Sequence, residues 1–241
     1  MNVLILSGSP RGPKSVTNKL LAALAAGISA GNGQVRQFSV CSMKIASCIG
    51  CLACMHKTPG VCAIKDDMEE IYGALKTSDI LVIGTPVYVD SMSSQMKAVI
   101  DRSVACLQPF LVRDKTGRIR HPFNWRMPGR FLLVSTSGFP ETATFDPLIA
   151  TFRAGAANFG AEPIGEVCIP GSIALQIQPD LLAGHLRLIE EMGQGLALEG
   201  RIDGESLKKI NIPPVQVGEY LEIAASYESW CRERLGDQAK P

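Results

Sequence analysis

Four of the eight cysteines in this 241-residue chain lie within fifteen residues, at Cys48, Cys51, Cys54 and Cys62. Two-residue spacings allow successive thiolates to point into one small volume, as they do in ferredoxin-type runs. Pro59-Gly60 predicts a turn that can bring Cys62 back as a fourth ligand. Gly50 relieves crowding where the backbone must curl around inorganic sulfide. The spacing therefore favours an iron–sulfur cluster.

Three other interpretations of the cysteines remain open. Zinc binds four thiolates, although structural zinc sites usually take two separated cysteine pairs rather than a close triplet. The cysteines could also be structural residues of a loop without metal. A disulfide is disfavoured, because no signal peptide is recognisable before the first apolar strand and we expect a cytoplasmic protein, where disulfides seldom persist.

A second group of polar residues lies between the first apolar strand and the first helical pattern, in residues 8–18. A phosphate monoester is bound by backbone N–H groups, hydroxyl donors and positive charge, and a helix N-terminus supplies much of this. The candidate donors are Ser9, Arg11, Ser15, Thr17 and Asn18. The sequence predicts a phosphate-binding loop, with an ordinary Gly/Pro turn and helix cap as the alternative.

The same loop nearly matches the G-x-x-x-x-G-K-[ST] pattern of nucleotide hydrolases, but Pro13 stands where the second glycine is needed. Proline has no N–H to donate and fixes φ, which interrupts a continuous cradle of amides. The apolar run 80–84 also ends without the aspartate that would hold magnesium. The pattern argues against an ATPase.

The elements that must position these groups alternate between strand and helix. Strands are predicted at 3–6, 35–40, 80–84, 130–135 and 163–169, and helices at 17–28, 66–76, 93–104, 145–159, 181–198 and 217–235. This order predicts an α/β fold with a doubly wound, flavodoxin-like, five-stranded parallel sheet in the order 2-1-3-4-5. Ligands of such sheets sit beyond the C-terminal ends of the strands.

The chain is expected to be one domain over residues 1–241. It would carry a cysteine loop at 48–62, an insert at 106–129 with a tight turn or small hairpin near 114–117, and a C-terminal helical extension over about 175–241. The formal net charge is +1, so no overall field favours nucleic acid or an anionic membrane as a partner. We expect neither.

Several motifs in order resemble the NAD(P)H-dependent FMN reductase-like flavoproteins. They are the loop from Ser7 to Thr17, the run Thr85-Pro86-Val87-Tyr88, and the segment from Met92 to Arg102. The resemblance implies that the first loop holds the phosphate of FMN. It also implies that the isoalloxazine ring is lined by Pro86, Val87, Tyr88 and Val89 on one side and by Thr136, Ser137 and Gly138 on the other.

The cysteine strip resembles the compact motif of the iron–sulfur flavoproteins, a branch of that family with one [4Fe–4S] cluster beside FMN. The resemblance implies electron transfer between a donor such as ferredoxin and a small acceptor, and a homodimer or homotetramer. A cluster-free NAD(P)H-dependent FMN or quinone reductase is the alternative, and a zinc-stabilised binding protein without redox activity is a third possibility. No catalytic side chain is predicted, since the chemistry belongs to the cofactor.

The insert at 106–129 is basic and aromatic, and the family pattern does not contain it. It could bind the 2′-phosphate of NADPH, dock an acidic ferredoxin or cover the flavin, or it could be a basic surface loop or a dimer contact.

Overall fold

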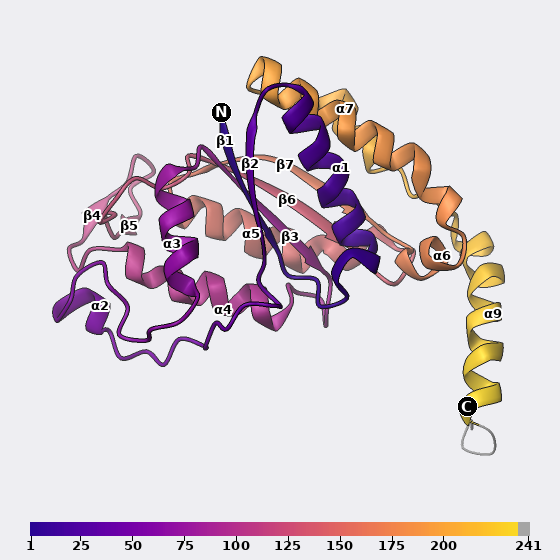
Figure 1. Ribbon diagram of the computed structural model, residues 1–241, viewed down its shortest axis with the longest axis horizontal. Helices are drawn as coiled ribbons and strands as arrows, with labels where there is room; N and C mark the ends of the chain where they lie inside the picture. Colours follow the sequence, from indigo (N-terminus) through magenta and orange to yellow (C-terminus); the bar gives the residue numbers. More distant parts are fainter. Residues whose placement is uncertain (236–241) are drawn as a thin grey trace.

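A five-stranded parallel sheet forms the centre of the computed structural model, which describes residues 1–235 (Figure 1). Its strands are β1 (Asn2–Ser7), β2 (Gln34–Ser39), β3 (Ile80–Pro86), β6 (Arg130–Thr136) and β7 (Glu162–Ile169). They lie in the order β2-β1-β3-β6-β7, and every neighbouring pair is parallel. Counted over the strands of this sheet alone, that is the predicted order 2-1-3-4-5, so the flavodoxin-like fold is confirmed.

Helices connect the strands and continue beyond the last of them. The α-helices are α1 (Val16–Ala30), α2 (Ala53–His56), α3 (Met68–Thr77), α4 (Ser94–Arg102), α5 (Asp146–Asn158), α6 (Ser172–Ile177), α7 (Ala183–Glu199), α8 (Gly204–Ile210) and α9 (Val217–Leu235). Short 3-10 helices are η1 (Gly12–Lys14), η2 (Ser103–Cys106), η3 (Thr142–Phe145) and η4 (Pro179–Leu182). The short helices α2, α6 and α8 were not expected from the sequence.

Each face of the sheet carries its own apolar core. Leu4, Leu6 and Ile83 belong to the core that α3, α4 and α5 cover, whereas Ile5 and Val82 belong to the core beneath α1, α7 and α8. Alternate residues of a strand point to opposite faces, so a strand covered on both sides must be apolar throughout. This explains the uninterrupted apolar runs of β1 and β3.

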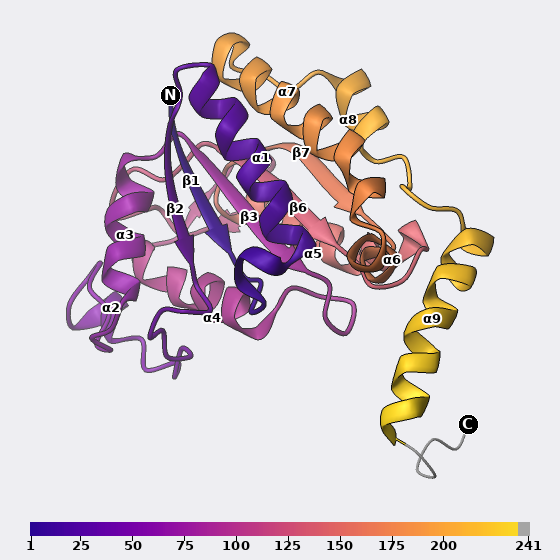
Figure 2. The same ribbon diagram turned by 45° about the vertical axis from the view of Figure 1, so that its right-hand side comes forward.

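The C-terminal extension contributes to the fold through α7, which packs along α1 (Figure 2). The two helices approach closely enough that only glycine fits at the contact. A Cβ on Gly193 would lie 2.6 Å from the carbonyl oxygen of Leu24. The core beneath α1, α7 and α8 therefore depends on residues that follow the last strand of the sheet.

Helix α9 projects away from the sheet (Figures 1 and 2). Only its first turns pack inward, where Tyr220 and Ile223 meet Ala174 and Val215. The end of the predicted extension, residues 236–241, lies outside the described residues. Within residues 1–235, no helix is both long and apolar enough to span a bilayer.

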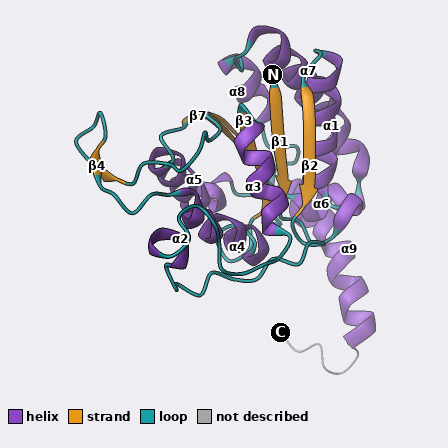
Figure 3. Cartoon of the chain, turned by 60° about the vertical axis from the view of Figure 1, so that its left-hand side comes forward, coloured by secondary structure: helices purple, strands orange, loops and turns teal. Residues whose placement is uncertain are grey.

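The insert at 106–129 forms the predicted small hairpin, with β4 (Val112–Arg113) antiparallel to β5 (Ile119–Arg120). It lies on the same side of the molecule as α2 and α3 (Figures 1 and 3). Its later part is anchored by Trp125. The rings of Trp125 and Tyr72 meet edge to face with their centroids 6.1 Å apart, and Nζ of Lys76 lies 4.4 Å from the centroid of the Trp125 ring. The insert is thus fixed next to the cysteine loop.

Candidate functional site

The predicted phosphate loop runs from β1 into α1 and is shaped by its own side chains. Ser15 is the N-cap of α1, and its Oγ accepts a hydrogen bond from the backbone N–H of Asn18 at 3.0 Å. Gly12 has a φ of +58°, which bends the chain back toward the helix. The first N–H groups of α1 consequently face the loop, with Ser9, Ser15 and Thr17 buried beside them.

Asn18 makes its side-chain hydrogen bonds within the loop. Its Oδ1 accepts from the Ser7 hydroxyl at 2.5 Å, and its Nδ2 donates to the Gly12 carbonyl at 2.7 Å. Both ends of the amide are used within the loop, and Asn18 is not among the residues that line the neighbouring cavity. The side chain holds the loop in shape, and its predicted contact with the FMN phosphate stays a prediction.

A cavity of about 510 Å³ lies against this loop at the C-terminal ends of the strands. Its volume is in the range of small-molecule and cofactor sites. Apart from Asn18, every residue predicted to bind FMN lines it: Ser9, Arg11, Ser15, Thr17, Pro86, Val87, Tyr88, Val89, Thr136, Ser137 and Gly138. The structure brings together three segments, of which the first and the last lie more than a hundred residues apart in the sequence.

One wall of the cavity is a strained turn after β3. Val89 and Asp90 have φ values of +48° and +59°, which residues other than glycine seldom adopt. Paired backbone hydrogen bonds between Tyr88 and Ser91, at 2.9 and 3.2 Å, hold the turn. Val89 is 96% exposed and Tyr88 45% exposed, so both stand at the rim, where a flat ligand could cover them. Such strain is typical of functional sites.

The opposite wall is tied to the loop by direct hydrogen bonds. The hydroxyls of Thr17 and Thr136 lie 2.7 Å apart, and the N–H of Val87 donates to the Thr136 carbonyl at 2.8 Å. The N–H of Ser137 donates to the Ile169 carbonyl at 3.2 Å. The three segments around the cavity are therefore held in a fixed relation.

Several lining residues were missed by the sequence analysis: Val16, Asp90, Phe139, Thr144, Ser172, Ile173 and Gln176. The residues of α6 follow the last strand of the sheet. The rule that ligands bind beyond the C-terminal ends of parallel strands could have found them.

All four cysteines of the predicted cluster line a second, much smaller cavity of about 20 Å³. Cys48 and Cys51 are exposed, Cys62 is half-buried and Cys54 is buried. Burial raises the pKa of the Cys54 thiol, and the neighbouring charges of Cys62, Cys51 and Cys48 raise it further. The four thiols thus lie close enough to influence one another.

The thiols are not arranged as a finished metal site. Within residues 1–235, no three His, Cys, Asp or Glu side chains stand together at metal-binding spacing. The donor set nevertheless suits an iron–sulfur cluster, because four thiols from one loop surround one pocket. Gly50 and Leu52 hold the loop in left-handed conformations, with φ of +65° and +52°. Cluster binding would require the exposed part of this loop, which includes Cys48 and Cys51, to move.

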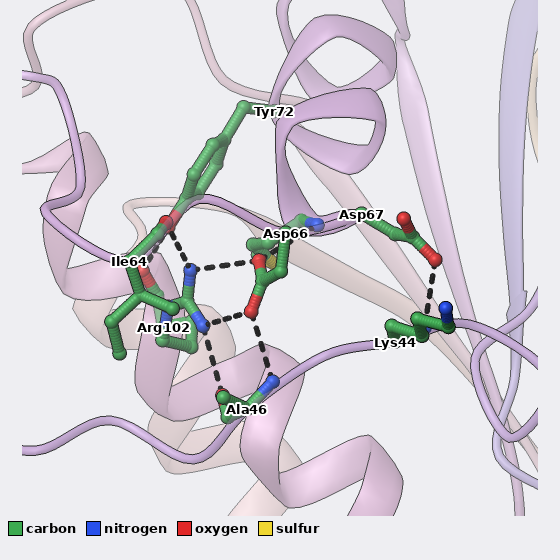
Figure 4. A network of polar contacts seen from close by, with 8 residues as sticks. Lys44, Ala46, Ile64, Asp66, Asp67, Tyr72 and Arg102 are labelled. Atoms are coloured by element: carbon green, nitrogen blue, oxygen red, sulfur yellow. Dashed lines mark hydrogen bonds and ion pairs between the residues drawn. The ribbon is translucent and has the colours of Figure 1, made fainter.

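An ion pair between Arg102 and Asp66 holds both ends of the cysteine loop (Figure 4). The pair is hydrogen-bonded to the backbone of Ala46 before the loop and of Ile64 after it. The Asp66 carboxylate accepts from Nη1 and Nη2 of Arg102 at 2.8 and 3.0 Å, and from the N–H of Ala46 at 2.9 Å. Burial alone would raise the pKa of Asp66, but the hydrogen bond from Arg102, together with those from Ala46 and Met68, lowers it below its ordinary value. Next to it, Asp67 accepts from the Lys44 N–H at 2.7 Å. The sequence predicted a helix over residues 66–76 but not this network.

Among the described residues, none from the insert at 106–129 lines the large cavity. The insert instead approaches the cysteine loop, since a Cβ on Gly60 would lie 2.9 Å from the Trp125 ring. The predicted roles of covering the flavin or binding NADPH at the flavin site are not favoured by this position.

The family model described as NADPH-dependent FMN reductase matches residues 1–141. An iron–sulfur flavoprotein of Methanocaldococcus jannaschii is 40% identical over 121 residues, which cover 48% of this chain and 59% of that protein. An iron–sulfur flavoprotein of Archaeoglobus fulgidus is 39% identical over 160 residues, covering 65% of this chain and 76% of that protein.

Solved structures with the same fold are more distant in sequence. An FMN-dependent NADH-azoreductase of Bacillus anthracis, in complex with FMN, has a TM-score of 0.61 at 18% identity and covers 82% of this chain and 100% of its own. An NAD(P)H:quinone oxidoreductase of Methanothermobacter marburgensis has a TM-score of 0.59 at 14% identity, covering 81% and 96%.

The parallel sheet and the loop at its first strand define a flavodoxin-like α/β protein with a cavity at the C-terminal ends of its strands. The chain belongs to the iron–sulfur flavoproteins within the NADPH-dependent FMN reductase family, a family of FMN-dependent oxidoreductases. It spans 59% of the length of the M. jannaschii relative.

Proposed function

We propose that this protein is an FMN-dependent redox protein that passes electrons from a one-electron carrier, such as a ferredoxin, to a small oxidant. FMN would occupy the large cavity, and a [4Fe–4S] cluster would be bound by Cys48, Cys51, Cys54 and Cys62. The observation that carries this assignment is the presence of both donor sets in one chain. An anion-binding loop lines one cavity, and four thiols line another.

The phosphate end of the large cavity is suited to a phosphate monoester. The hydroxyls of Ser9, Ser15 and Thr17 are buried at its base, and Arg11 is exposed at its edge. These groups would donate hydrogen bonds to the phosphate oxygens while the N-terminus of α1 contributes its dipole. Arg11 would add a charge-assisted bond.

The other end of the cavity is suited to a flat aromatic ring. Pro86 is the last residue of β3, Tyr88 comes from the turn after it, and Phe139 comes from the turn after β6. The fixed backbone of these turns would orient the ring and exclude water from one side of it. Bound FMN would supply both one-electron and two-electron chemistry, which is what links a one-electron carrier to a two-electron oxidant.

The cysteine loop would bind the cluster through thiolates. Burial raises the pKa of the Cys54 thiol, so cluster assembly must displace its proton, and metal binding would become weaker as the pH falls. The relatives named as iron–sulfur flavoproteins support the presence of a cluster. The donor, the acceptor, cytoplasmic localisation and assembly into a dimer or tetramer remain predictions from the sequence.

A cluster-free NAD(P)H-dependent FMN or quinone reductase is the second candidate. One observation favours it: the four thiols do not stand at metal-binding spacing. In this case the cysteines would be structural residues of the loop, and a reduced nicotinamide would be the electron donor.

Anaerobic purification followed by analysis of flavin, iron, acid-labile sulfide and zinc distinguishes the candidates. We expect about one FMN with about four iron and about four sulfide per chain. Flavin without iron, together with rapid oxidation of NADH or NADPH, would favour the cluster-free reductase. Zinc without flavin would contradict both.

A further inference from the structure

The cavity of the four cysteines is also lined by a charged side chain, Arg102, at the end of α4. It is the largest of the fully buried side chains described, with 1% of its surface exposed. Burying a guanidinium is costly unless each of its donors finds a partner. Each N–H group of Arg102 is therefore expected to have a hydrogen-bond acceptor.

Four of the five N–H donors of Arg102 are accounted for (Figure 4). Nη1 donates to the Ala46 carbonyl at 2.9 Å and to Asp66 at 2.8 Å. Nη2 donates to the Ile64 carbonyl at 3.2 Å and to Asp66 at 3.0 Å. The fifth donor, Nε–H, is buried and has no hydrogen-bond partner among the described residues.

The bonds that Arg102 does make turn this free donor away from Asp66, and Arg102 lines the pocket of the cysteines. Asp66 bridges the two Nη atoms, so the Nε edge of the planar guanidinium is turned away from the carboxylate. Ala46 and Ile64 flank the cysteine loop on its two sides, and Arg102 lines the same pocket as Cys62. Tyr72 fixes the backbone of Arg102 by donating to its carbonyl oxygen at 2.7 Å.

We infer that Nε–H of Arg102 donates a hydrogen bond to a sulfur atom of the group that the four cysteines bind, and that Arg102 thereby positions this group and raises its reduction potential. The inference rests on the proposed cluster. Leaving a buried N–H without an acceptor is destabilising, because the group has lost its hydrogen bonds to water and gained none in return. Thiolate and sulfide sulfur atoms at this pocket are the acceptors that would satisfy it.

The effect on potential follows from charge. Reduction adds one electron from an external carrier to the cluster, and no covalent bond forms or breaks. The sulfur atoms become more negative, so a hydrogen bond to them is stronger in the reduced state. A donor that favours the reduced state raises the potential, and its loss lowers it.

The bond can be tested in the intact holoprotein by labelling its arginines with the heavy nitrogen isotope. Pulsed electron paramagnetic resonance of the dithionite-reduced cluster should detect a coupled arginine nitrogen. Arg102→Lys keeps the positive charge but removes Nε–H, so the coupling should disappear. Arg126→Lys is the matched control, because Arg126 pairs with Asp79 at the surface and does not line the cysteine pocket. The coupling should persist there.

A redox titration gives the second readout. Arg102→Lys should lower the equilibrium constant for one-electron reduction of the cluster about tenfold, which is a shift of about 59 mV to lower potential. Arg126→Lys should leave the potential unchanged. The inference would be overturned if a cluster is present but shows no coupling to an arginine nitrogen. It would also be overturned if the coupling persists in Arg102→Lys. Either result would leave the proposed function standing. If Arg102→Lys does not fold, the labelled wild-type and Arg126→Lys spectra still decide. Absence of iron and sulfide from the wild-type protein would remove both proposals.

Discussion

Replacing Asp66 with asparagine removes the only carboxylate that compensates the buried charge of Arg102 among the described residues. The two side chains are 10% and 1% exposed. Asparagine keeps the size of the side chain and one acceptor oxygen, but it has no charge. Arg102 would then retain only uncharged acceptors, namely the carbonyls of Ala46 and Ile64 and the amide oxygen of the new side chain.

Breaking a buried ion pair by neutralising one partner costs about 3–5 kcal/mol, because the remaining charge is left without compensation. Asp79→Asn is the matched control, since the Arg126–Asp79 pair is 58% and 33% exposed. Exposed pairs contribute about 0.2–1 kcal/mol. We therefore expect the free energy of unfolding, measured by urea denaturation of the apoprotein at pH 7, to fall several times further in Asp66→Asn than in Asp79→Asn.

The pH dependence gives an independent check. The pKa of Asp66 is lowered in the folded protein, so its charge stabilises the fold above the unfolded pKa of about 3.9 and this stabilisation is lost as the pH falls through the folded pKa. The gap between wild type and Asp66→Asn should be constant near neutral pH and narrow in acid. Equal losses in the two variants, or a gap that does not narrow in acid, would refute this account of the pair.

Three further predictions test other parts of the structure. Arg11→Ala should weaken FMN binding about tenfold, as measured by fluorescence titration, because it removes a charge-assisted hydrogen bond. Lys14 lies outside the cavity lining, so Lys14→Ala should leave FMN binding unchanged. Gly193→Ala should lower the free energy of unfolding by about 1–3 kcal/mol, because its Cβ would meet the Leu24 carbonyl of α1, while Gly195→Ala on the same helix has open space and should be neutral or stabilising. Arg118→Glu on the exposed hairpin of the insert should slow reduction by an acidic ferredoxin several-fold in stopped-flow experiments, and the difference should shrink at high salt. An unchanged rate at low salt would argue against docking there.

The sheet could be predicted from the sequence because its central strands are covered on both faces. Residues 80–83 are all buried, so the apolar run of β3 is continuous and easily recognised. The large cavity was predictable for a related reason: parallel strands end at one edge, and the turns that follow them must meet there. Thr17 and Thr136, 119 positions apart, are hydrogen-bonded at this edge.

Side-chain roles within these segments were less predictable. Asn18 has the donor groups that a phosphate needs, but the same amide also satisfies Ser7 and Gly12, and nothing in the spacing distinguishes the two uses. The buried network of Arg102 was not predictable at all. Its partners Asp66 and Ala46 lie 36 and 56 positions away in irregular loops, for which no periodicity exists.

The anion pocket at the start of α1 is the central claim, and titration of the apoprotein with FMN and with riboflavin tests it most directly. The two ligands share the ring and the sugar chain and differ only in the phosphate. If Ser9, Arg11, Ser15 and Thr17 hold the phosphate, FMN should bind at least about a hundredfold more tightly, a difference of about 2.7 kcal/mol. Equal affinity for both ligands, or no binding of either, would contradict the account.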